Sequence, residues 1–507
     1  MDLDFGDYDA PDYFTEDMIP EDMDLSDLDL SNIPEDVLEQ LMAEYFQNNY
    51  ETYDYESDPQ PVDISYVEHF KDCGLPTLQQ AIQIIGPLLL LSVCVKLSSV
   101  TGFPKVLVHL LSTATGLVSL YLFFHTSLHF LITFSILGYS LLFLLDQTNY
   151  QRKGAACAVM CLLYSFDLLC EPYVLEKELF VAEPTEWHKV RGSQMILAMK
   201  IISMGFDLDT GQIPSLPGPV EYQGYCFCVG SVIFGPWTSY NSYLEVVQSS
   251  SLNWRWLFSG IFAVFLSLIC LLLSTCVSSI LFMTTEYKWL QAYRDAFSFR
   301  TSHYFVSYAS EATAILVGFG ETRSDDKITW NIPVARPWRV EIPRSLGEVV
   351  VSWNLPMHHW LKAYVFKISR PLGQFPAVLL TFMASAMLHG LNFQLAAVLI
   401  SLAFISYIEF GLRKKLADAF SACILARSCK PECVHNYRTF HPIVLLMNLV
   451  FGLLTIFHLA YLGVMFDTDS SLQEEGYDMS HTLNKWSELD YASHYVALVT
   501  FLCYWLI

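Results

Sequence analysis

The chain has 507 residues, of which 53% are apolar and only 16% are charged, and its formal net charge is −24. This composition excludes an ordinary soluble globular protein of such length. Repeated apolar runs of membrane-spanning length instead predict an all-α polytopic membrane protein, with membrane lipids around it and no nucleic acid as a partner.

The negative charge belongs mainly to the N-terminal tail. Residues 1–60 carry 20 Asp or Glu and no Lys or Arg, which leaves a formal charge of −4 for the rest of the chain. We predict that residues 1–62 form an acidic, largely disordered tail and that residues 63–507 form one membrane domain. The N-terminus has no basic region followed by an apolar core, so the first transmembrane helix is expected to direct insertion.

Four apolar runs predict the first membrane spans, at residues 81–96, 106–124, 128–145 and 155–170. Lys96 and Lys105 flank the turn after the first run, and Arg152 and Lys153 follow the third. Basic loops remain in the cytosol, so both turns are expected there. The acidic loop 171–186 and the N-terminal tail are then expected on the lumenal side.

The middle of the chain is less regular. Lys200 interrupts an apolar stretch at 193–209, and glycines and prolines at 221–240 predict a broken, re-entrant hairpin. A long span is expected at 257–283, and the basic segment 321–345 is expected in the cytosol. Aromatic and basic residues are mixed between these two segments, so the number of crossings in this region stays open.

The end of the chain predicts helices at 377–389, at 395–410, from about 443 onward and at 491–507. The basic loop after residue 410 is expected in the cytosol, and the acidic loop 467–490 in the lumen. One crossing separates the basic loop from the break at Gly390, which places His389 toward the lumenal half of the bilayer. A lumenal N-terminus and a cytosolic C-terminus require an odd number of crossings, and about eleven fits the apolar length.

Two polar side chains in this apolar region, His389 and Asn354, are the predicted catalytic residues. An uncommitted polar group is costly at membrane depth. An imidazole can accept a proton from an attacking hydroxyl, and a carboxamide can hold an oxyanion without a buried charge. The alternatives are a histidine that hydrogen-bonds another helix and an asparagine that caps or kinks the helix before Pro356.

Three aromatic residues, a serine and a leucine near this pair are the predicted substrate-binding residues: Trp353, Trp360, Tyr364, Ser385 and Leu388. Aromatic rings could wall an acyl tunnel, because they are rigid and apolar with a polar tip. Small residues beside His389 allow a ligand to approach closely. An interfacial aromatic belt is the alternative for the tryptophans and the tyrosine.

Three acidic residues lie near the broken middle stretch. Asp207, Asp209 and Glu221 either shape the mouth of a substrate site or form local turns. Local turns are the favoured interpretation, because Asp side chains readily cap turns.

The cysteines suggest neither a disulfide framework nor a metal. Thirteen are present, and those in apolar runs, such as Cys276, are expected to be small buried hydrophobic residues. Cys423, Cys429, Cys433 and His435 form a C-x5-C-x3-C-x-H pattern that matches none of the usual zinc spacings. Free thiols or S-acylation in a basic juxtamembrane loop are therefore expected, and no metal.

The motifs together resemble the membrane-bound O-acyltransferase family. The resemblance rests on Ser352-Trp353-Asn354 with Trp360, and on the stretch 385–390 that contains His389. Further stretches resemble the branch of that family that lipidates Wnt proteins: 187–189, 191–195, 205–209, 234–237, 310–314, 342–345, 421–423 and 485–489. The likeness covers residues 66–507 and does not extend to the tail.

The resemblance implies an endoplasmic reticulum enzyme with about eleven transmembrane helices and re-entrant segments around a central cavity. Palmitoleoyl-CoA, a co-substrate and not a bound cofactor, would enter from the cytosol, and a serine of a Wnt protein from the lumen. His389 would take the serine proton and Asn354 would orient the thioester. Such an activity would support Wnt secretion and signalling.

Two other functions remain open on the residues alone. One is O-acyl transfer to a lipid or another acceptor on the same fold. The other is a non-enzymatic membrane transporter or scaffold, in which the intramembrane polar groups line a permeation path or bind a cargo.

Overall fold

The computed structural model describes residues 70–169, 184–249, 251–278, 287–324, 327–390, 393–430, 432–466 and 479–507. The predicted disordered tail at 1–62 lies outside the described residues, as do parts of the predicted acidic loops. Residues Tyr66–Ile507 form one compact unit.

Within the described residues, five stretches are long and apolar enough to cross a membrane: Phe70–Val100, Lys105–Gln147, Trp254–Val277, Phe393–Phe420 and Pro442–Gly463. Shorter apolar helices occupy Lys153–Ser165, Gln374–Leu388 and Ala492–Leu506. Between 28% and 39% of each long apolar window is buried inside the protein, so most of its side chains remain available to lipid. The described chain is therefore a helical polytopic membrane protein, as the composition predicts.

The first four predicted spans are confirmed as helices: α3 at Leu75–Val100, α4 at Lys105–Phe124, α5 at Leu128–Gln147 and α6 at Lys153–Leu169. Their short connections bring neighbouring helices together. Gly116 of α4 lies against the backbone carbonyl of Phe227, and a Cβ at this position would collide with that carbonyl. The glycine therefore permits close contact between α4 and the middle of the chain.

The predicted break in the middle region is confirmed as a series of short helices. After α7 at Pro184–Asp209 come α8 at Pro219–Cys226, α9 at Val229–Val232 and α10 at Tyr240–Gln248. The Lys200 ammonium of α7 donates hydrogen bonds to the carbonyls of Tyr225 (2.7 Å) and Cys226 (3.2 Å) and to Ser231 Oγ (2.8 Å). This lysine interrupts an apolar run because it satisfies backbone groups that the broken helices leave open.

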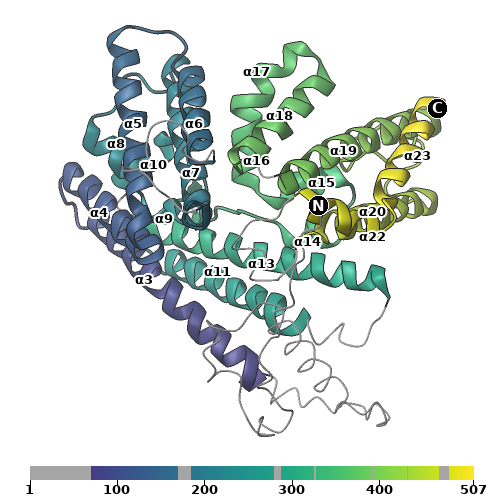
Figure 1. Cartoon of the computed structure of the whole chain (residues 1–507), viewed down its shortest axis with the longest axis horizontal. Coiled ribbons are helices and arrows are strands. Elements are labelled where there is room, and N and C mark those ends of the chain that lie inside the picture. Colours follow the sequence, from purple (N-terminus) through teal and green to yellow (C-terminus); the bar gives the residue numbers. More distant parts are fainter. Residues whose placement is uncertain are drawn as a thin grey trace, which may run out of the picture. The chain divides into compact units, whose positions relative to one another are not determined.

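A long helix, α13 at Lys288–Val317, was not predicted from the sequence. It packs against α11 at Trp254–Leu272 and leads into a hairpin of strands β1 at Glu321–Ser324 and β2 at Lys327–Trp330. The two strands are antiparallel, with Glu321 opposite Trp330. In Figure 1, α11 and α13 lie beneath α5, α6 and α7 on one side and beneath α16, α18 and α19 on the other, and α3 runs below α11.

The last third of the chain begins with short helices and ends with long ones. The short ones are α14 at Pro337–Glu341, α15 at Leu346–Trp353, α16 at Leu355–Leu361, η6 at Lys362–Phe366, α17 at Lys367–Ser369 and η7 at Arg370–Leu372. The others are α18 at Gln374–Leu388, α19 at Phe393–Phe420, α20 at Pro442–Gly463, α22 at Met479–Glu488 and α23 at Ala492–Leu506. The predicted helices in this region are confirmed, including the break at Gly390, where φ is +87°.

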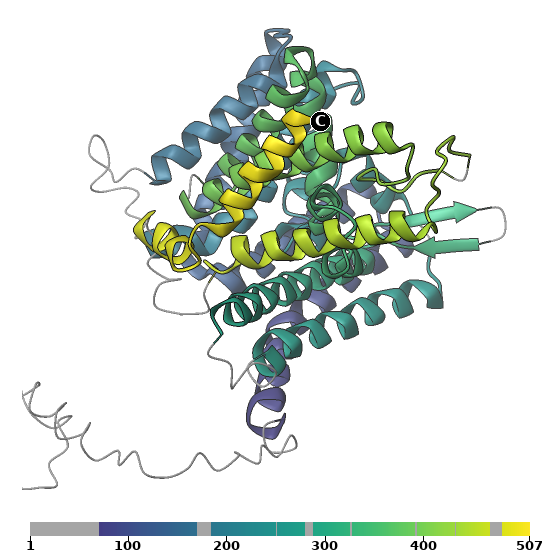
Figure 2. The same ribbon diagram turned by 90° about the vertical axis from the view of Figure 1, so that its right-hand side faces the viewer.

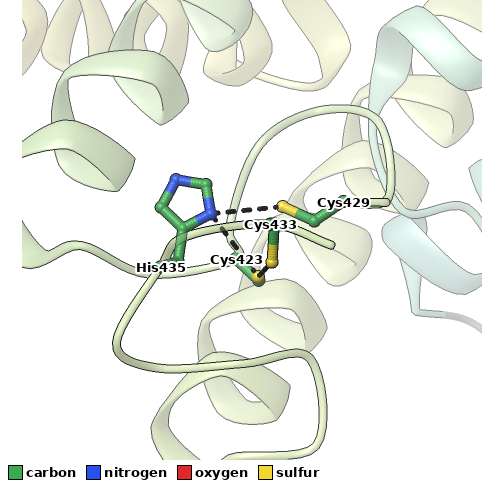
Figure 3. A group of neighbouring side chains, drawn as sticks. All are labelled: Cys423, Cys429, Cys433 and His435. Carbon is green, nitrogen blue, oxygen red and sulfur yellow. Dashed lines mark hydrogen bonds between the residues drawn. The ribbon is translucent and has the colours of Figure 1, made fainter. Parts of the chain in front are cut away.

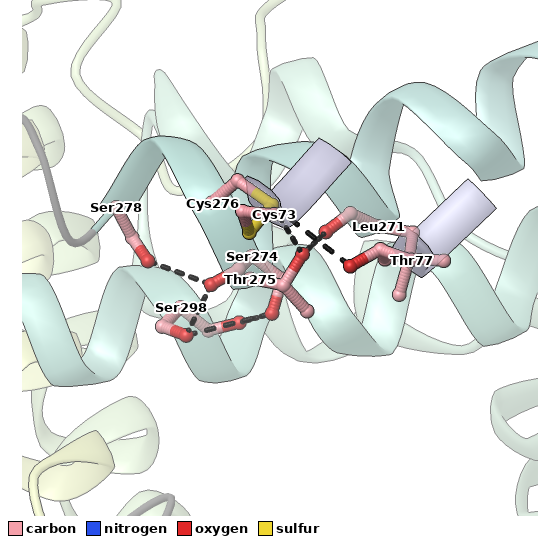
Figure 4. The surroundings of a disulfide bond; sticks show 8 residues. All are labelled: Cys73, Thr77, Leu271, Ser274, Thr275, Cys276, Ser278 and Ser298. Atoms are coloured by element: carbon pink, nitrogen blue, oxygen red, sulfur yellow. Dashed lines mark hydrogen bonds between the residues drawn. A yellow bond between two sulfur atoms is a disulfide. The ribbon is translucent and has the colours of Figure 1, made fainter. Parts of the chain in front are cut away.

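A disulfide that the sequence did not reveal corrects the expectation for Cys276. Cys73 in η3 (Phe70–Gly74) pairs with Cys276 in η5 (Leu273–Val277), with a Cα–Cα distance of 5.9 Å. Figure 4 shows the disulfide beside hydrogen bonds that join η5 to α13, including Ser274 Oγ to the Ser298 carbonyl at 2.9 Å. The sequence separation of 203 residues carries no local signal for such a pair.

Candidate active site

A mostly apolar cavity of about 530 Å³ lies between α13, α15, α16, α18, α19 and α20. Both Asn354 and His389 line it. The cavity volume falls within the roughly 300–1,000 Å³ typical of small-molecule sites. Residues 35 positions apart in the sequence therefore contribute to one cavity.

His389 is positioned by the end of α18. It is the C-terminal capping residue, with φ −79° and ψ 2°, and its backbone N–H donates to the Ser385 carbonyl at 3.2 Å. Gly390 follows in a left-handed conformation that a residue with a Cβ rarely adopts. The chain therefore turns away directly after the imidazole, and Ser385, one turn earlier, lines the same cavity.

Asn354 is positioned by the junction between α15 and α16. Its backbone is extended, with φ −147° and ψ 97°, and its Oδ1 accepts a hydrogen bond from the backbone N–H of Met357 at 3.0 Å. It is therefore the N-cap that the sequence offered as an alternative. The same bond fixes the orientation of the amide, because only the oxygen can accept, and it leaves Nδ2 as the donor end.

The predicted substrate-binding residues divide into two groups. Trp353 and Ser385 line the cavity with the catalytic candidates, whereas Trp360, Tyr364 and Leu388 do not. The Trp360 indole donates to the Met199 carbonyl at 3.0 Å, and the Tyr364 hydroxyl donates to the Asp207 carboxylate at 2.8 Å.

Leu388 packs against the largest hydrophobic cluster, which also includes Trp360 and, at its edge, Tyr364. Because Met199 and Asp207 both belong to α7, the hydrogen bonds of Trp360 and Tyr364 hold α16 and η6 against that helix. The structure thus gives these three side chains packing positions outside the cavity.

Sequence reasoning missed one complete wall of the cavity. Ala296, Phe299, Arg300 and His303 of α13 all line it. The His303 ring stacks on Trp353 with centroids 4.4 Å apart, and its Nε2 lies 2.9 Å from the Trp353 carbonyl oxygen. Each of these four residues lies three or four positions from another of them, as residues on one face of a helix do. This spacing is the sequence signal that could have identified them.

The three acidic candidates have local partners. Asp209 accepts hydrogen bonds from the backbone N–H groups of Lys153 and Gly154, at 3.0 and 2.9 Å, and so holds the start of α6. Asp207 accepts from Tyr364, and Glu221 accepts from the Tyr240 hydroxyl at 3.2 Å. None of the three lines the cavity. Their hydrogen bonds connect helices to one another, and the three side chains do not form the mouth of this cavity.

A second cavity of about 940 Å³ adjoins α16. His358 and Lys362 line both cavities, so α16 and the start of η6 lie between them. Arg323 of the hairpin and Arg336 also line the second cavity, together with Glu245 and Glu321. Glu321 is already engaged by Arg323 Nε (2.7 Å) and by Ser249 Oγ (2.6 Å).

The fold and the site define a helical membrane protein with a mostly apolar cavity lined by one carboxamide, that of Asn354, and by three imidazoles, those of His303, His358 and His389. The sequence profile of the membrane-bound O-acyltransferase family matches residues 177–415, a span that contains both Asn354 and His389. The chain belongs to the membrane-bound O-acyltransferase family, which confirms the resemblance seen in the motifs.

Relatives with assigned names agree with this membership. The protein-serine O-palmitoleoyltransferase porcupine of Mus musculus is 45% identical over 456 residues, which cover 86% of this chain and 96% of the relative. Porcupine of Drosophila melanogaster is 32% identical over 467 residues, covering 86% of each chain. Lysophospholipid acyltransferase 1 of Arabidopsis thaliana is 25% identical over 336 residues, covering 56% of this chain and 68% of the relative.

Proposed function

We propose that the chain transfers a palmitoleoyl group from palmitoleoyl-CoA to a serine hydroxyl of a Wnt protein. The observation that carries this proposal is the 45% identity to protein-serine O-palmitoleoyltransferase porcupine over 96% of that protein's length. A largely apolar cavity lined by His389 and by one carboxamide suits a long acyl chain and its thioester. As the acyl donor is a co-substrate, the reaction needs no bound cofactor.

The proposed chemistry assigns one step to each polar group. A ring nitrogen of His389 accepts the serine proton as the oxygen attacks the thioester carbonyl. Nδ2 of Asn354 donates to the oxyanion of the tetrahedral intermediate, which carries its charge in a site of low dielectric. The carbon–sulfur bond then breaks, and the CoA thiolate takes the proton from the imidazolium.

The second cavity is the proposed entrance for CoA. Arg323, Arg336 and Lys362 line it, and their cations match the phosphates of that donor. Lys362 also reaches the first cavity, so a donor bound across α16 could place its thioester near Asn354.

The proposed location is the endoplasmic reticulum membrane, with the N-terminus in the lumen and the C-terminus in the cytosol. About eleven crossings would be made by α3, α4, α5, α6, α7, α11, α13, α18, α19, α20 and α23. The helices α8 to α10 would then be re-entrant. The Cys73–Cys276 disulfide supports a lumenal start of α3, because disulfides persist in oxidising compartments.

A lipid acceptor is the second candidate, favoured by the match to lysophospholipid acyltransferases of plants and yeast. The two candidates differ only in which hydroxyl enters the cavity. The experiment incubates purified full-length protein with an alkyne-labelled palmitoleoyl-CoA and either a serine-containing Wnt hairpin peptide or lysophosphatidylcholine.

The proposal predicts label on the serine peptide and none on a peptide with alanine in place of that serine. Label on the lipid alone would contradict the proposed acceptor and favour the second candidate. Label on neither acceptor, from protein that still binds the donor, would contradict both enzymatic functions.

A further inference from the structure

Four potential metal ligands converge in the loop 421–441, between α19 and α20. Cys423, Cys429, Cys433 and His435 each offer one donor atom, and these atoms all lie within 4.8 Å of one another. Figure 3 shows the three sulfur atoms and His435 Nδ1 directed toward a common point. Cys423 is buried, and the other three side chains are partly buried.

Both sulfur-to-nitrogen distances measured within this cluster match those of a tetrahedral site. With Zn–S of about 2.3 Å and Zn–N of about 2.05 Å, tetrahedral geometry requires S···N edges of about 3.6 Å and S···S edges of about 3.8 Å. The Cys423 and Cys429 sulfurs each lie 3.6 Å from His435 Nδ1. The Cys423 and Cys433 sulfurs lie 3.2 Å apart, which is shorter than the tetrahedral S···S edge but well beyond the S–S bond length of about 2.05 Å.

The cluster and the disulfide lie at opposite ends of the helices. Gly463, at the end of α20, packs on Ala296 near the start of α13, so α20 runs antiparallel to α13 and begins near the hairpin. Figure 2 shows the loop 421–441 and the hairpin projecting from the same end of the helices. Ser298, also near the start of α13, is hydrogen-bonded to η5, which carries the disulfide.

This arrangement separates two redox environments. The two ends of α11 carry the hairpin and the disulfide: the Trp330 indole donates to Asn253 at the start of α11, and Cys276 follows its end. Because Trp254–Val277 is long and apolar enough to cross a membrane, the two ends face different compartments. A disulfide indicates an oxidising compartment on one side, so the thiol cluster faces the reducing side, where clustered cysteines bind metal instead of pairing.

The loop backbone is held in place by groups outside the cluster. The Arg344 guanidinium donates to the carbonyls of Cys423 (2.8 Å) and Leu425 (3.1 Å), and Ser345 Oγ donates to the Ala426 carbonyl (3.1 Å). The Cys423 N–H donates to the Tyr437 carbonyl at 2.9 Å. These bonds orient the ligands, and the nearby cation offsets the net negative charge of a zinc ion bound to three thiolates and one imidazole.

We propose that Cys423, Cys429, Cys433 and His435 bind a structural zinc ion. Zinc is the metal that best fits three thiolates and one imidazole in tetrahedral geometry, and four protein ligands leave no open position for catalysis. The zinc fixes a long segment that contains little regular structure. The sequence spacing alone had favoured free or acylated thiols, because it does not show how the loop folds.

The loop 421–441, called the zinc loop from here on, is connected to the candidate active site. Arg427, which lies between Cys423 and Cys429 in the sequence, lines the cavity with Asn354 and His389. Ser345, which holds the loop, is the N-cap of α15, and α15 ends at Trp353. On the proposed function, loss of zinc would therefore weaken the use of acyl-CoA without removing a reacting group.

The test measures zinc in full-length protein purified in detergent without added metal, by inductively coupled plasma mass spectrometry. Wild type is expected to hold about one zinc per chain. Cys429→Ser and His435→Ala should lose most of it. Cys503→Ser is the matched control, because Cys503 is an exposed cysteine far along the chain in α23, and it should keep the zinc.

A second measurement guards against misfolded variants. Wild-type protein treated with a strong chelator should expose the loop thiols to maleimide and melt at a lower temperature, and added zinc should reverse both changes. Well-folded wild type without zinc, full zinc retention by both ligand variants, or thioester-linked acyl groups on Cys429 or Cys433 would each overturn the proposal.

Discussion

Asn354 combines two properties that sequence reasoning treated as alternatives. Its side-chain oxygen accepts a hydrogen bond from the Met357 N–H and so caps α16. The same side chain lines the cavity to which α18 also contributes. The cap holds the amide in one orientation, and a fixed donor is what stabilisation of an oxyanion requires. A structural contact thus prepares the group for its proposed chemistry.

Replacing Asn354 by Asp separates these two properties. An aspartate retains the N-cap and favours the helix N-terminus, but it removes the Nδ2 donor. We expect a melting temperature close to wild type and a kcat lower by roughly 100-fold or more. Asn354→Ala should lose both properties, with about 1 kcal/mol of stability as well. Wild-type kcat in the Asp variant would contradict the donor role.

At the residue scale, the sequence predicted polar groups better than it predicted ring orientations. His389 and Asn354 could be selected because polar groups are rare in apolar segments. Trp360 could not be placed, because its hydrogen-bond partner Met199 is 161 positions away. His303 was overlooked because its helix had not been recognised.

At the scale of elements, α13 explains what the sequence could not show. Its 30 residues include aromatic, basic and small side chains, and it is buried against several helices instead of presenting one apolar stripe. The helices α3, α4, α5, α11, α19 and α20 followed directly from apolar length. Helix α13 lacks a long apolar run, because it places polar side chains such as Arg300 and His303 in the cavity.

The interaction of α7 with the broken middle segment predicts an effect of Lys200→Met. Three hydrogen bonds from the ammonium would be lost, leaving the Tyr225 and Cys226 carbonyls and the Ser231 hydroxyl without this buried donor. We expect a loss of about 1–3 kcal/mol in stability, seen as a lower melting temperature in detergent. Lys414→Met, at an exposed lysine of α19, is the control and should melt like wild type. An unchanged melting temperature for Lys200→Met would argue against this role.

The disulfide between η3 and η5 predicts a pattern of alkylation. In protein denatured without reductant, maleimide should modify Cys94 and Cys503 but not Cys73 or Cys276. Reductant should make the latter two reactive. Mass spectrometry of the peptides measures this, and modification of both cysteines before reduction would contradict the pair.

At the scale of the whole molecule, the hairpin and the zinc loop share one end, and the disulfide marks the other. Positive charge predicted that residues 321–345 and the loop after residue 410 lie on one side, and Figure 2 shows the hairpin and residues 421–441 at the same end of the helices. The sequence could not reveal either cysteine arrangement, because one joins distant segments and the other depends on the fold of a loop. Long-range pairs leave no periodic trace.

The proposed orientation predicts where glycosylation occurs. An N-glycosylation acceptor inserted within residues 467–478 should be modified in cells, because that segment is expected in the lumen. The same insertion at residues 325–326, between β1 and β2, should remain unmodified. A mobility shift removed by endoglycosidase H reports the modification. The reverse pattern would invert the topology.

The central claim is that the imidazole at position 389 carries out proton transfer in the shared cavity. The decisive measurement is palmitoleoyl transfer to a serine peptide by purified His389→Ala, compared with wild type and with His129→Ala, a change at an exposed histidine. The account predicts that His389→Ala loses about 100-fold or more in kcat while it still binds acyl-CoA, and that the control is unaffected. A His389→Ala protein that transfers acyl groups at the wild-type rate would contradict it.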